Sequence, residues 1–421
     1  MGSMKHTDAA RVAIISLHTS PFDQPGVGDS GGMNVEIRAL SERLGARGVA
    51  VDIFTRCAGR PSPEVEAVGP MARIVQVPAG PCAEVDKLEL PALAPGFAES
   101  LVRRAAELGP YDLVHAHYWL SGAAGIAAAR RWEVPLIVSF HTLAAVKNLA
   151  GAAVPEPLAR LVGERQAVEA ADRVLAPTRQ DARALIDLYG ADPERVRVVP
   201  PGVDPATFFP RDRDEARARL DLADGPVVLF VGRLQELKGP DLAIRAFAEA
   251  VRRGSPATRA ATLLIVGGPS GAEGGSILGR LRRIAAEEGV LERICLMAPV
   301  PHGELPWIYS AADVLLMPSR SESFGLAALE AQACGVPVVA SRVGGLRTAV
   351  RQGASGYLVE RRDPRAYASR IVAILESPQL AQRLARGAVG HAARFPWETT
   401  VDRLVGEYAE LFPVLDDAAA S

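Results

Sequence analysis

Two glutamates in the second half of the chain bracket a strand-to-helix turn that could bind an anion. In the segment SESFGLAALEAQACG, Glu330 follows Glu322 by eight residues. Eight residues are close to two helical turns, so we expect both carboxylates near one face of a helix. The amides of Ser323, Phe324 and Gly325 would open that helix, where free N–H groups bind a phosphate. The pattern predicts Glu330 on the ribose hydroxyls and Glu322 on the donor sugar, with ordinary surface charges as the alternative.

Two cations follow an earlier strand of the same half. In the segment GRLQELKG, Arg233 and Lys238 lie five residues apart, directly after a strand that ends in Gly232. Parallel sheets bind ligands at the carboxyl ends of their strands, and two cations there could hold a diphosphate leaving group. Solvated loop charges are the alternative interpretation.

A glycine-rich segment, GVGDSGGMN, separates the first strand from the first helix. We expect Gly31 and Gly32 to adopt φ values closed to other residues and to let a ligand approach the backbone. The helix that follows would present its N-terminus to an anion. The segment is not the dinucleotide pattern G-x-G-x-x-G, so hydride transfer loses its main support, while a flexible turn stays possible as a structural alternative.

The elements that must position these residues form two series of alternating strands and helices. Short β-branched runs alternate with segments of helical period, the pattern of a parallel sheet covered by helices. The first series predicts strands at residues 11–17, 51–55, 113–116, 136–140 and 173–176, with a helix near 34–47. The second predicts strands at 226–232, 261–266, 294–297, 314–317, 336–340 and 356–359. We therefore predict two doubly wound, Rossmann-like domains, residues 11–200 and 201–396.

The join between the two series is rich in proline. Residues 198–212, VVPPGVDPATFFPRD, contain four prolines, which exclude regular structure and favour an extended linker. Residues 397–412 read as an amphipathic helix after the second series has ended, so we expect this helix to return across the join to the first domain.

Composition narrows the function classes. The chain has 421 residues, 47 Lys+Arg against 49 Asp+Glu and a net charge of -2, so a nucleic-acid coat or a membrane-surface module is not indicated. No apolar run reaches the roughly 18 residues of a membrane span, and the first residues, MGSMKHTDAA, lack an apolar signal region. Cys57, Cys82, Cys295 and Cys334 have no metal spacing and are expected to be thiols of a cytoplasmic protein.

At these residues the chain resembles the retaining nucleotide-sugar glycosyltransferases of the GT-B architecture. The combination of E-x7-E with the GR…K element carries this resemblance over about residues 11–412. The segments HTSPFDQPGVGDSGGMN, HAHYWLSG and HTLAAVKN are similar to those of the mycothiol-pathway enzymes that transfer N-acetylglucosamine from UDP to inositol phosphate. The resemblance implies an acceptor-binding first domain, a nucleotide-sugar-binding second domain and a returning C-terminal helix.

The resemblance also assigns roles to individual residues. It implies an acceptor phosphate held by Lys87, Tyr118, Thr142 and Arg160, and acceptor hydroxyls held by His18, Asp29 and Asn34. Donor contacts would come from Gln24, Gly32, Arg233, Lys238, Val300, Glu322, Ser323, Phe324, Gly325 and Glu330. The catalytic set would be His141, Arg233, Lys238 and Glu322, with His141 holding the 6-hydroxyl of the sugar and shielding the anomeric carbon. We expect no cofactor and no metal beyond the nucleotide-sugar co-substrate.

Three departures from the family pattern concern the substrates. The acidic stretch between KN and PEP is shortened to LAGAAV, Cys82 to Glu84 replace an aromatic-Glu-Gly, and Val300 offers the base no charge. A paralogue that uses a GDP-sugar or other nucleotide sugar and a small acceptor such as a zwitterionic thiol is therefore the leading alternative. A sugar-nucleotide epimerase and a non-catalytic sensor are minor alternatives. The expected partners are a nucleotide sugar and a small acceptor, without nucleic acid or membrane, and a homodimer is left open.

Overall fold

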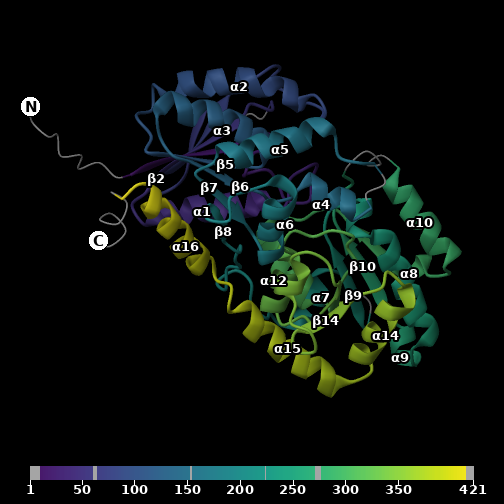
Figure 1. Cartoon of the computed structure of the whole chain (residues 1–421). Coiled ribbons are helices and arrows are strands. Elements are labelled where there is room, and N and C mark those ends of the chain that lie inside the picture. Colours follow the sequence, from purple (N-terminus) through teal and green to yellow (C-terminus); the bar gives the residue numbers. More distant parts are fainter. Residues whose placement is uncertain (1–9, 60–63, 152–153, 223, 271–275, 414–421) are drawn as a thin grey trace, which may run out of the picture.

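Two parallel sheets organise the chain (Figure 1). The computed structural model describes residues 10–59, 64–151, 154–222, 224–270 and 276–413. Most of the segment MGSMKHTDAA, and residues 152–153 of LAGAAV, lie outside the described residues. No helix among those that are described combines the length and apolar character needed to cross a membrane.

The first sheet has eight strands within the described residues. Their order is β3 (Val65–Gly69), β4 (Ala72–Val77), β2 (Ala50–Arg56), β1 (Arg11–Ser16), β5 (Leu113–His117), β6 (Leu136–Ser139), β7 (Arg173–Ala176) and β8 (Val196–Val198). Only the β3–β4 pair is antiparallel in this sheet, and every other described pair is parallel. The order reverses at β1, where a doubly wound sheet places its ligand crevice.

Helices cover both faces of the first sheet. One apolar core joins inward residues of the strands to α2 (Leu90–Ala105), α3 (Trp119–Trp132), α5 (Leu158–Ala170) and α6 (Arg179–Tyr189). The opposite face packs against α1 (Gly32–Ala46) and the last helix, α16 (Trp397–Leu411). The short α4 (Ala144–Leu149) follows β6.

The second sheet has six described strands, all paired in parallel. Their order is β11 (Ile294–Met297), β10 (Thr262–Val266), β9 (Val227–Val231), β12 (Val314–Met317), β13 (Val338–Ser341) and β14 (Gly356–Val359). One face packs against α8 (Pro240–Arg253), α10 (Ile277–Glu287), α14 (Pro364–Leu375) and α15 (Pro378–Ala392). The other packs against α11 (Leu305–Ser310), α12 (Leu326–Ala333) and α13 (Leu346–Ala349). The short α7 (Arg213–Arg219) contacts α11, and α9 (Pro256–Arg259) contacts α8.

The last helix returns to the first sheet. Figure 1 shows α15 and α16 running along one side of the molecule, from the second sheet back to the first. Val401, Leu404, Val405 and Tyr408 of α16 are buried against Ile37, Leu40 and Leu44 of α1 and strands of the first sheet. The predicted GT-B architecture, with its returning helix, is confirmed.

Some elements were not predicted. The β3–β4 hairpin and β8 are absent from the expected first series. β3 is at least partly exposed throughout and β8 has three residues, which explains their weak signal. β4, ARIVQV, is mostly buried and does carry the β-branched pattern, so its signal was missed. Each strand that the sequence did predict is present, and its observed ends differ from the predicted ends by at most two residues. The proline-rich join contains only the end of β8 and an isolated bridge between Val203 and Pro396.

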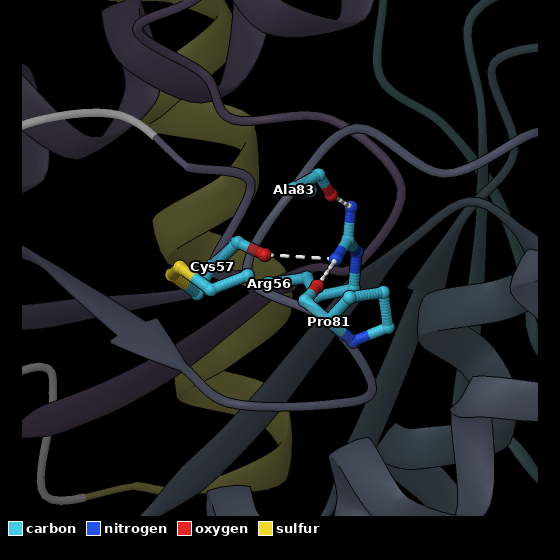
Figure 2. Close-up of a disulfide and its surroundings, with 5 residues drawn as sticks. Arg56, Cys57, Pro81 and Ala83 are labelled. Atoms are coloured by element: carbon cyan, nitrogen blue, oxygen red, sulfur yellow. Dashed lines mark hydrogen bonds between the residues drawn. A yellow bond between two sulfur atoms is a disulfide. The ribbon is translucent and has the colours of Figure 1, made fainter.

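The expectation of four thiols is wrong for one pair. Cys57, directly after β2, forms a disulfide with Cys82, and their Cα atoms are 5.0 Å apart. Figure 2 shows the neighbouring Arg56 side chain donating to the carbonyls of Cys57, Pro81 and Ala83, at 2.8, 2.8 and 2.7 Å. The pairing spans 25 residues, a distance at which spacing alone gives no signal. Cys295 and Cys334 are free.

Candidate active site

A cavity of about 290 Å³ lies between the two sheets. The loops that line it follow the carboxyl ends of β1, β5, β6 and β7 on one side and of β9, β10, β11 and β12 on the other. Parallel sheets bind ligands at these ends. The fold therefore brings side chains of both halves to one cleft, as the motif positions predicted.

The second-domain wall carries two cations. Arg233 follows β9, and its Nη1 lies 3.4 Å from Oδ1 of Asp29 in the glycine-rich segment of the first domain. Lys238 ends a short 3₁₀ turn, and its Nζ lies 2.5 Å from Oε2 of Glu322. Each cation is thus balanced by one carboxylate that also faces the cleft. An incoming polyanion would exchange these carboxylates for its own oxygens.

The turn that contains Glu322 differs from the expectation in one respect. Helix α12 begins at Leu326, so Glu322 precedes the helix rather than sharing a helical face with Glu330. Glu322 and Glu330 nevertheless both line the cleft, because the turn before α12 lies at the same end of the sheet. Gly325 enters the helix at φ +99°, and a Cβ there would lie 2.7 Å from Cδ2 of Leu346, so glycine is required. Ser323, Phe324 and Gly325, whose amides precede the first turn of the helix, line the same cleft.

The far end of the second-domain wall holds a carboxylate with two partners. Oε1 of Glu330 lies 2.7 Å from Nε2 of His302, and Oε2 accepts the Tyr309 hydroxyl at 2.8 Å. Burial lowers the pKa of His302, but Glu330 outweighs it and holds the pKa above its ordinary value. Val300 lines the cleft beside them. The carboxylate is therefore fixed in place and keeps lone pairs for ligand hydroxyls.

The first-domain wall carries a second, separate set of polar groups. Lys87 Nζ lies 3.2 Å from Asp29 Oδ1 and 5.9 Å from the ring centre of Tyr118. Burial raises the pKa of Asp29, but Lys87 and Arg233 outweigh it and hold the pKa below its usual range. His18 packs against Tyr118 with ring centres 4.4 Å apart and the rings tilted by 40°, and burial followed by Lys87 lowers the pKa of His18 to about 3. Asp29 thus pairs both with Lys87 of the first-domain wall and with Arg233 of the second-domain wall.

Tyr118 adopts a backbone conformation that is rare for residues with a Cβ. Its φ is +76° and its ψ is 158°, at the junction between β5 and α3. Such a conformation costs on the order of 1–3 kcal/mol and persists only where surrounding contacts impose it. The side chain is 4% exposed and lies under Lys87 and Arg160. Tyr118 lines the cleft in this conformation.

Arg160 lies behind this wall in a buried network. Its Nε donates to Glu164 at 2.8 Å, its Nη2 to the Thr142 hydroxyl at 2.8 Å, and its Nη1 lies 2.8 Å from Glu156. Burial lowers the pKa of Arg160, but Tyr118, Glu164 and Glu156 outweigh it and raise the pKa. Glu156 also pairs with Lys147 at 2.9 Å, and burial followed by Arg160 lowers the pKa of Lys147 to about 8. Thr142 and Lys147 line the cleft.

A row of histidines lies behind the centre of the cleft. His141 Nε2 is 2.9 Å from His117 Nδ1, and its Nδ1 is 3.6 Å from Oε2 of Glu36. His115 lies beside His117, with ring centres 4.1 Å apart, and contacts the hydroxyl of Tyr408 in α16 at 2.7 Å. Burial lowers the pKa of His141 and His115 to about 3 each. These imidazoles are therefore neutral near neutral pH.

Most of the predicted site residues meet at this cleft. Those that line it are His18, Asp29, Gly32, Lys87, Tyr118, His141, Thr142, Arg233, Lys238, Val300, Glu322, Ser323, Phe324, Gly325 and Glu330. The other predicted site residues are Gln24, Asn34 and Arg160. Gln24 donates to the Pro299 carbonyl at 2.9 Å. Asn34, 1% exposed and in the first turn of α1, bonds to Gly31 and to Thr19 and Ser20 of the loop after β1.

The structure adds cleft residues that the motifs did not indicate. Glu36, Lys147, His302 and Tyr309 all line the cavity. Lys147 lies in the segment HTLAAVKN and could have been found from it, whereas Glu36 is signalled only by lying one helical turn after Gly32.

The two glycines at the end of the glycine-rich loop allow close packing between segments and do not provide unusual backbone torsions. The expectation of φ values closed to other residues is wrong for both glycines. The φ of Gly31, -168°, is extended backbone that any residue adopts, and Gly32 opens helix α1 without a positive φ. A Cβ on Gly32 would lie 3.2 Å from Cδ1 of Leu326. Gly32 therefore permits close approach of the first helix to the start of α12.

Metal ligation is not indicated at the cleft. Across the part of the chain that the structure describes, no group of three or more His, Cys, Asp or Glu is arranged to hold a metal ion. Asp212 and Asp214, which have the D-x-D spacing, lie at the start of α7, where Asp212 caps the helix by accepting from Glu215.

Comparisons with known proteins agree with this geometry. The profile of the family "Glycosyltransferase Family 4" matches residues 30–207, and that of "Glycosyl transferases group 1" matches residues 212–389. The sucrose-phosphate synthase from Thermosynechococcus elongatus superposes with a TM-score of 0.88 at 32% identity, over 96% of this chain and 100% of that one.

Curated relatives narrow the assignment. A D-inositol 3-phosphate glycosyltransferase from Acidothermus cellulolyticus is 50% identical, over 95% of this chain and 90% of the relative. One from Geodermatophilus obscurus is 51% identical, over 94% of this chain and 89% of the relative. Because such relatives span nearly the whole sequence, the chain belongs to the family of D-inositol 3-phosphate glycosyltransferases, enzymes of the GT-B fold.

Proposed function

We propose that this enzyme transfers N-acetylglucosamine from its UDP ester to inositol phosphate with retention of anomeric configuration. The observation that carries the proposal is the presence of two separate cation sets on opposite walls of one cleft. Arg233 and Lys238 face it from the second domain, and Lys87 and Lys147 from the first. Two anionic groups, a diphosphate and an acceptor phosphate, can be held there at the same time.

The donor lies along the second-domain wall in this proposal. Glu330 accepts hydrogen bonds from the ribose hydroxyls, and the base lies beside Val300. Arg233, Lys238 and the amides of Ser323 to Gly325 bind the diphosphate, which frees Glu322 from Lys238 to contact the sugar.

The acceptor lies along the first-domain wall. Lys87, Lys147 and the hydroxyls of Tyr118 and Thr142 receive its phosphate, and Arg160 orients Thr142 from behind. His18 and Asp29 contact the acceptor ring. Asn34 holds the glycine-rich loop in place in this proposal, since its side-chain amide is already bonded to Gly31 and Thr19.

Transfer follows front-face displacement. The bond between the anomeric carbon and the diphosphate oxygen breaks, and the acceptor oxygen bonds to that carbon from the same face. The acceptor's proton passes to the departing diphosphate oxygen. Arg233, Lys238 and the amides of the Glu322 turn stabilise the developing negative charge without a metal, because they are fixed before the charge appears.

Domain closure completes the site. The proposed boundaries, residues 11–200 and 201–396 with 397–412 returning, put the hinge at the proline-rich join and at the start of α16. Donor binding should reduce the radius of gyration in small-angle scattering. We also propose a cytoplasmic enzyme, and size-exclusion chromatography with light scattering tests whether it forms a homodimer.

The Arg160 network favours a second candidate. Glu156 and Glu164 both pair with Arg160, so the charge of this residue is already balanced in the free protein. The first-domain wall then offers the two lysines, a set that also suits an acceptor carboxylate. A paralogue that joins a GDP-sugar to a small zwitterionic thiol fits this arrangement.

One experiment separates the two candidates. The protein is incubated with UDP-, GDP- and TDP-sugars, each with inositol phosphate, free inositol or a small betaine thiol, and the products are identified by mass spectrometry and NMR. An α-linked product from UDP-N-acetylglucosamine and inositol phosphate supports the first proposal. Turnover of a GDP-sugar without any product from inositol phosphate overturns it in favour of the second candidate, and a β-linked product overturns retention.

A further inference from the structure

The disulfide between Cys57 and Cys82 fastens the loop that carries Lys87 into the cleft. Residues 78–89 join β4 to α2, and Cys82 lies in this loop five residues before Lys87. Lys87 lines the cleft and pairs with Asp29 at 3.2 Å. Cys57 lies outside the loop, directly after β2, which is paired with β1 on one side and β4 on the other. The disulfide therefore ties a cleft loop to the end of an inner strand of the first sheet.

Beyond Cys82 the loop has little packing of its own. Residues 83–89 are described throughout, and Val85 is the one among them that is not exposed. Val85 packs partly against the core of the first domain, whereas Leu88, next to Lys87, is 76% exposed. A segment with so few buried contacts is held mainly by its ends. The position of Lys87 therefore depends on how the loop is fixed at Cys82.

The backbone around the two cysteines is arranged for their pairing. The buried Arg56 side chain donates to the carbonyl of Cys57 and to the carbonyls on both sides of Cys82 (Figure 2). Gly59 adopts a φ of +78°, and a Cβ there would lie 3.0 Å from the carbonyl oxygen of Cys82. These contacts do not involve the sulfur atoms, so they keep the two cysteines at a Cα distance suited to a disulfide when the bond is open. The bond can therefore break and form again without rebuilding the loop.

The disulfide is accessible from solution. Cys82 is exposed and Cys57 is partly exposed, so a small thiol or disulfide can reach the pair. The first domain buries a large apolar core and does not depend on a cross-link for its stability. Disulfides of cytoplasmic proteins are mostly transient, catalytic or redox-sensing. For the proposed cytoplasmic enzyme, a redox site is therefore the expected role of this pair.

We propose that Cys57 and Cys82 form a redox site at which thiol-disulfide exchange sets the affinity of the enzyme for its anionic acceptor through Lys87. The role of Lys87 at the acceptor anion rests on the proposed function, whereas the redox site depends on neither the sugar nor the base. In the disulfide form Lys87 is held at the cleft before the acceptor arrives. In the dithiol form residues 83–89 gain freedom, and acceptor binding must order them at a cost in binding free energy.

The exchange reaction uses a low-molecular-weight disulfide as its oxidant. The thiolate of the exposed Cys82 attacks one sulfur of the small disulfide, and one small thiol leaves. The thiolate of Cys57 then attacks the Cys82 sulfur of this mixed disulfide, and the second small thiol leaves. Two electrons pass from the protein dithiol to the small disulfide, and the two cysteine protons end on the two small thiols. An excess of small thiol reverses both steps.

The test compares the full chain equilibrated with glutathione disulfide and with dithiothreitol. Alkylation and mass spectrometry should find the thiols of Cys57 and Cys82 blocked as an intramolecular disulfide in the oxidised form alone. The KM for inositol phosphate should be about three- to tenfold higher in the reduced form, with a similar kcat. Amide hydrogen exchange of residues 83–89 should be faster in the reduced form, and this measurement needs no substrate.

Matched variants separate this effect from a general loss of structure. Cys57→Ser and Cys82→Ser should each show the KM of the reduced form under either treatment. Cys295→Ala changes a free thiol of the second domain and should keep the full redox response. In Lys87→Gln the acceptor KM should no longer depend on redox state, because the loop then carries no cation into the cleft. The nucleoside diphosphate should bind both forms equally, since its proposed contacts lie on the second domain.

Three results would overturn the inference. These are an equal acceptor KM in the two forms, equal exchange rates at residues 83–89, and a redox response that persists in Cys57→Ser. Equal weakening of donor and acceptor binding on reduction would also overturn it, because a general structural effect would then account for the change. Failure of the proposed function would appear separately, as the absence of product from inositol phosphate in both forms while amide exchange at residues 83–89 still responds.

Discussion

Replacing Lys87 by glutamine should remove the preference for an anionic acceptor. Lys87 extends to Asp29 at 3.2 Å with a side chain 43% exposed, so it reaches the cleft without supporting the core. A hydrogen bond to a charged group contributes about 1.5–3 kcal/mol, which predicts a KM for inositol phosphate raised about 10- to 100-fold. The free energy of unfolding should change by less than about 1 kcal/mol, because exposed ion pairs contribute little to stability.

The assay is initial-rate kinetics at saturating donor, with inositol phosphate and with free inositol. The free inositol rate should stay near the wild-type value, since it has no phosphate for Lys87 to bind. Asp29→Asn added to Lys87→Gln should recover part of the loss, because the unpaired Asp29 carboxylate would otherwise repel the phosphate. Arg252→Gln, on the exposed side of α8, is the matched control. An unchanged KM for inositol phosphate, or an equal loss with free inositol, would refute the reasoning.

Three further changes test other parts of the cleft and its support. Lys238→Met should lower kcat on the order of a hundredfold or more at saturating donor, and normal turnover would remove this residue from leaving-group stabilisation. Arg160→Ala should lower the free energy of unfolding by about 3–5 kcal/mol in denaturant titrations, since Glu164 is fully buried and loses its ion pair; an unaffected midpoint would contradict the network. Glu36 should make stability fall as pH rises from its ordinary pKa of 4.5 to about 8, because the unfolded chain releases this proton first; Glu36→Gln should flatten the fall, and an identical pH dependence of stability in the wild type and Glu36→Gln would contradict it.

The sequence was most informative where chemistry follows directly from a strand end. Arg233, Lys238 and the amides of the Glu322 turn could be placed because parallel sheets present their carboxyl ends to one cleft. The placement of Glu322 on a helical face was wrong, since the chain turns before α12 begins. Eight-residue spacing carries no information on where a helix starts.

Other features depend on contacts between distant segments. From the sequence, Arg160 was expected to be free to bind the acceptor. In the structure it already pairs with Glu164 on its own helix and with Glu156 in the preceding loop. Glu36 has no motif, and its protonation follows from side chains of β7, α16 and neighbouring loops that line the cavity behind it. Cys57 and Cys82 meet because β2 and the loop after β4 end side by side. The Arg160 pairs do follow the four-residue helical period and could have been expected, whereas the surroundings of Glu36 and the disulfide follow no period.

The packing of α16 on the first sheet has a consequence for how the chain acquires its structure. The apolar face formed by Ile37, Leu40 and Leu44 is covered by residues of α16, which are synthesised roughly 200 residues after β8. At about 5–20 residues per second this face waits about 10–40 s for its cover. The first domain must therefore dwell on the ribosome as an incomplete, adhesive intermediate that chaperones can bind. A chain whose synthesis stops before α16 keeps that apolar face uncovered and open to contact with other apolar surfaces.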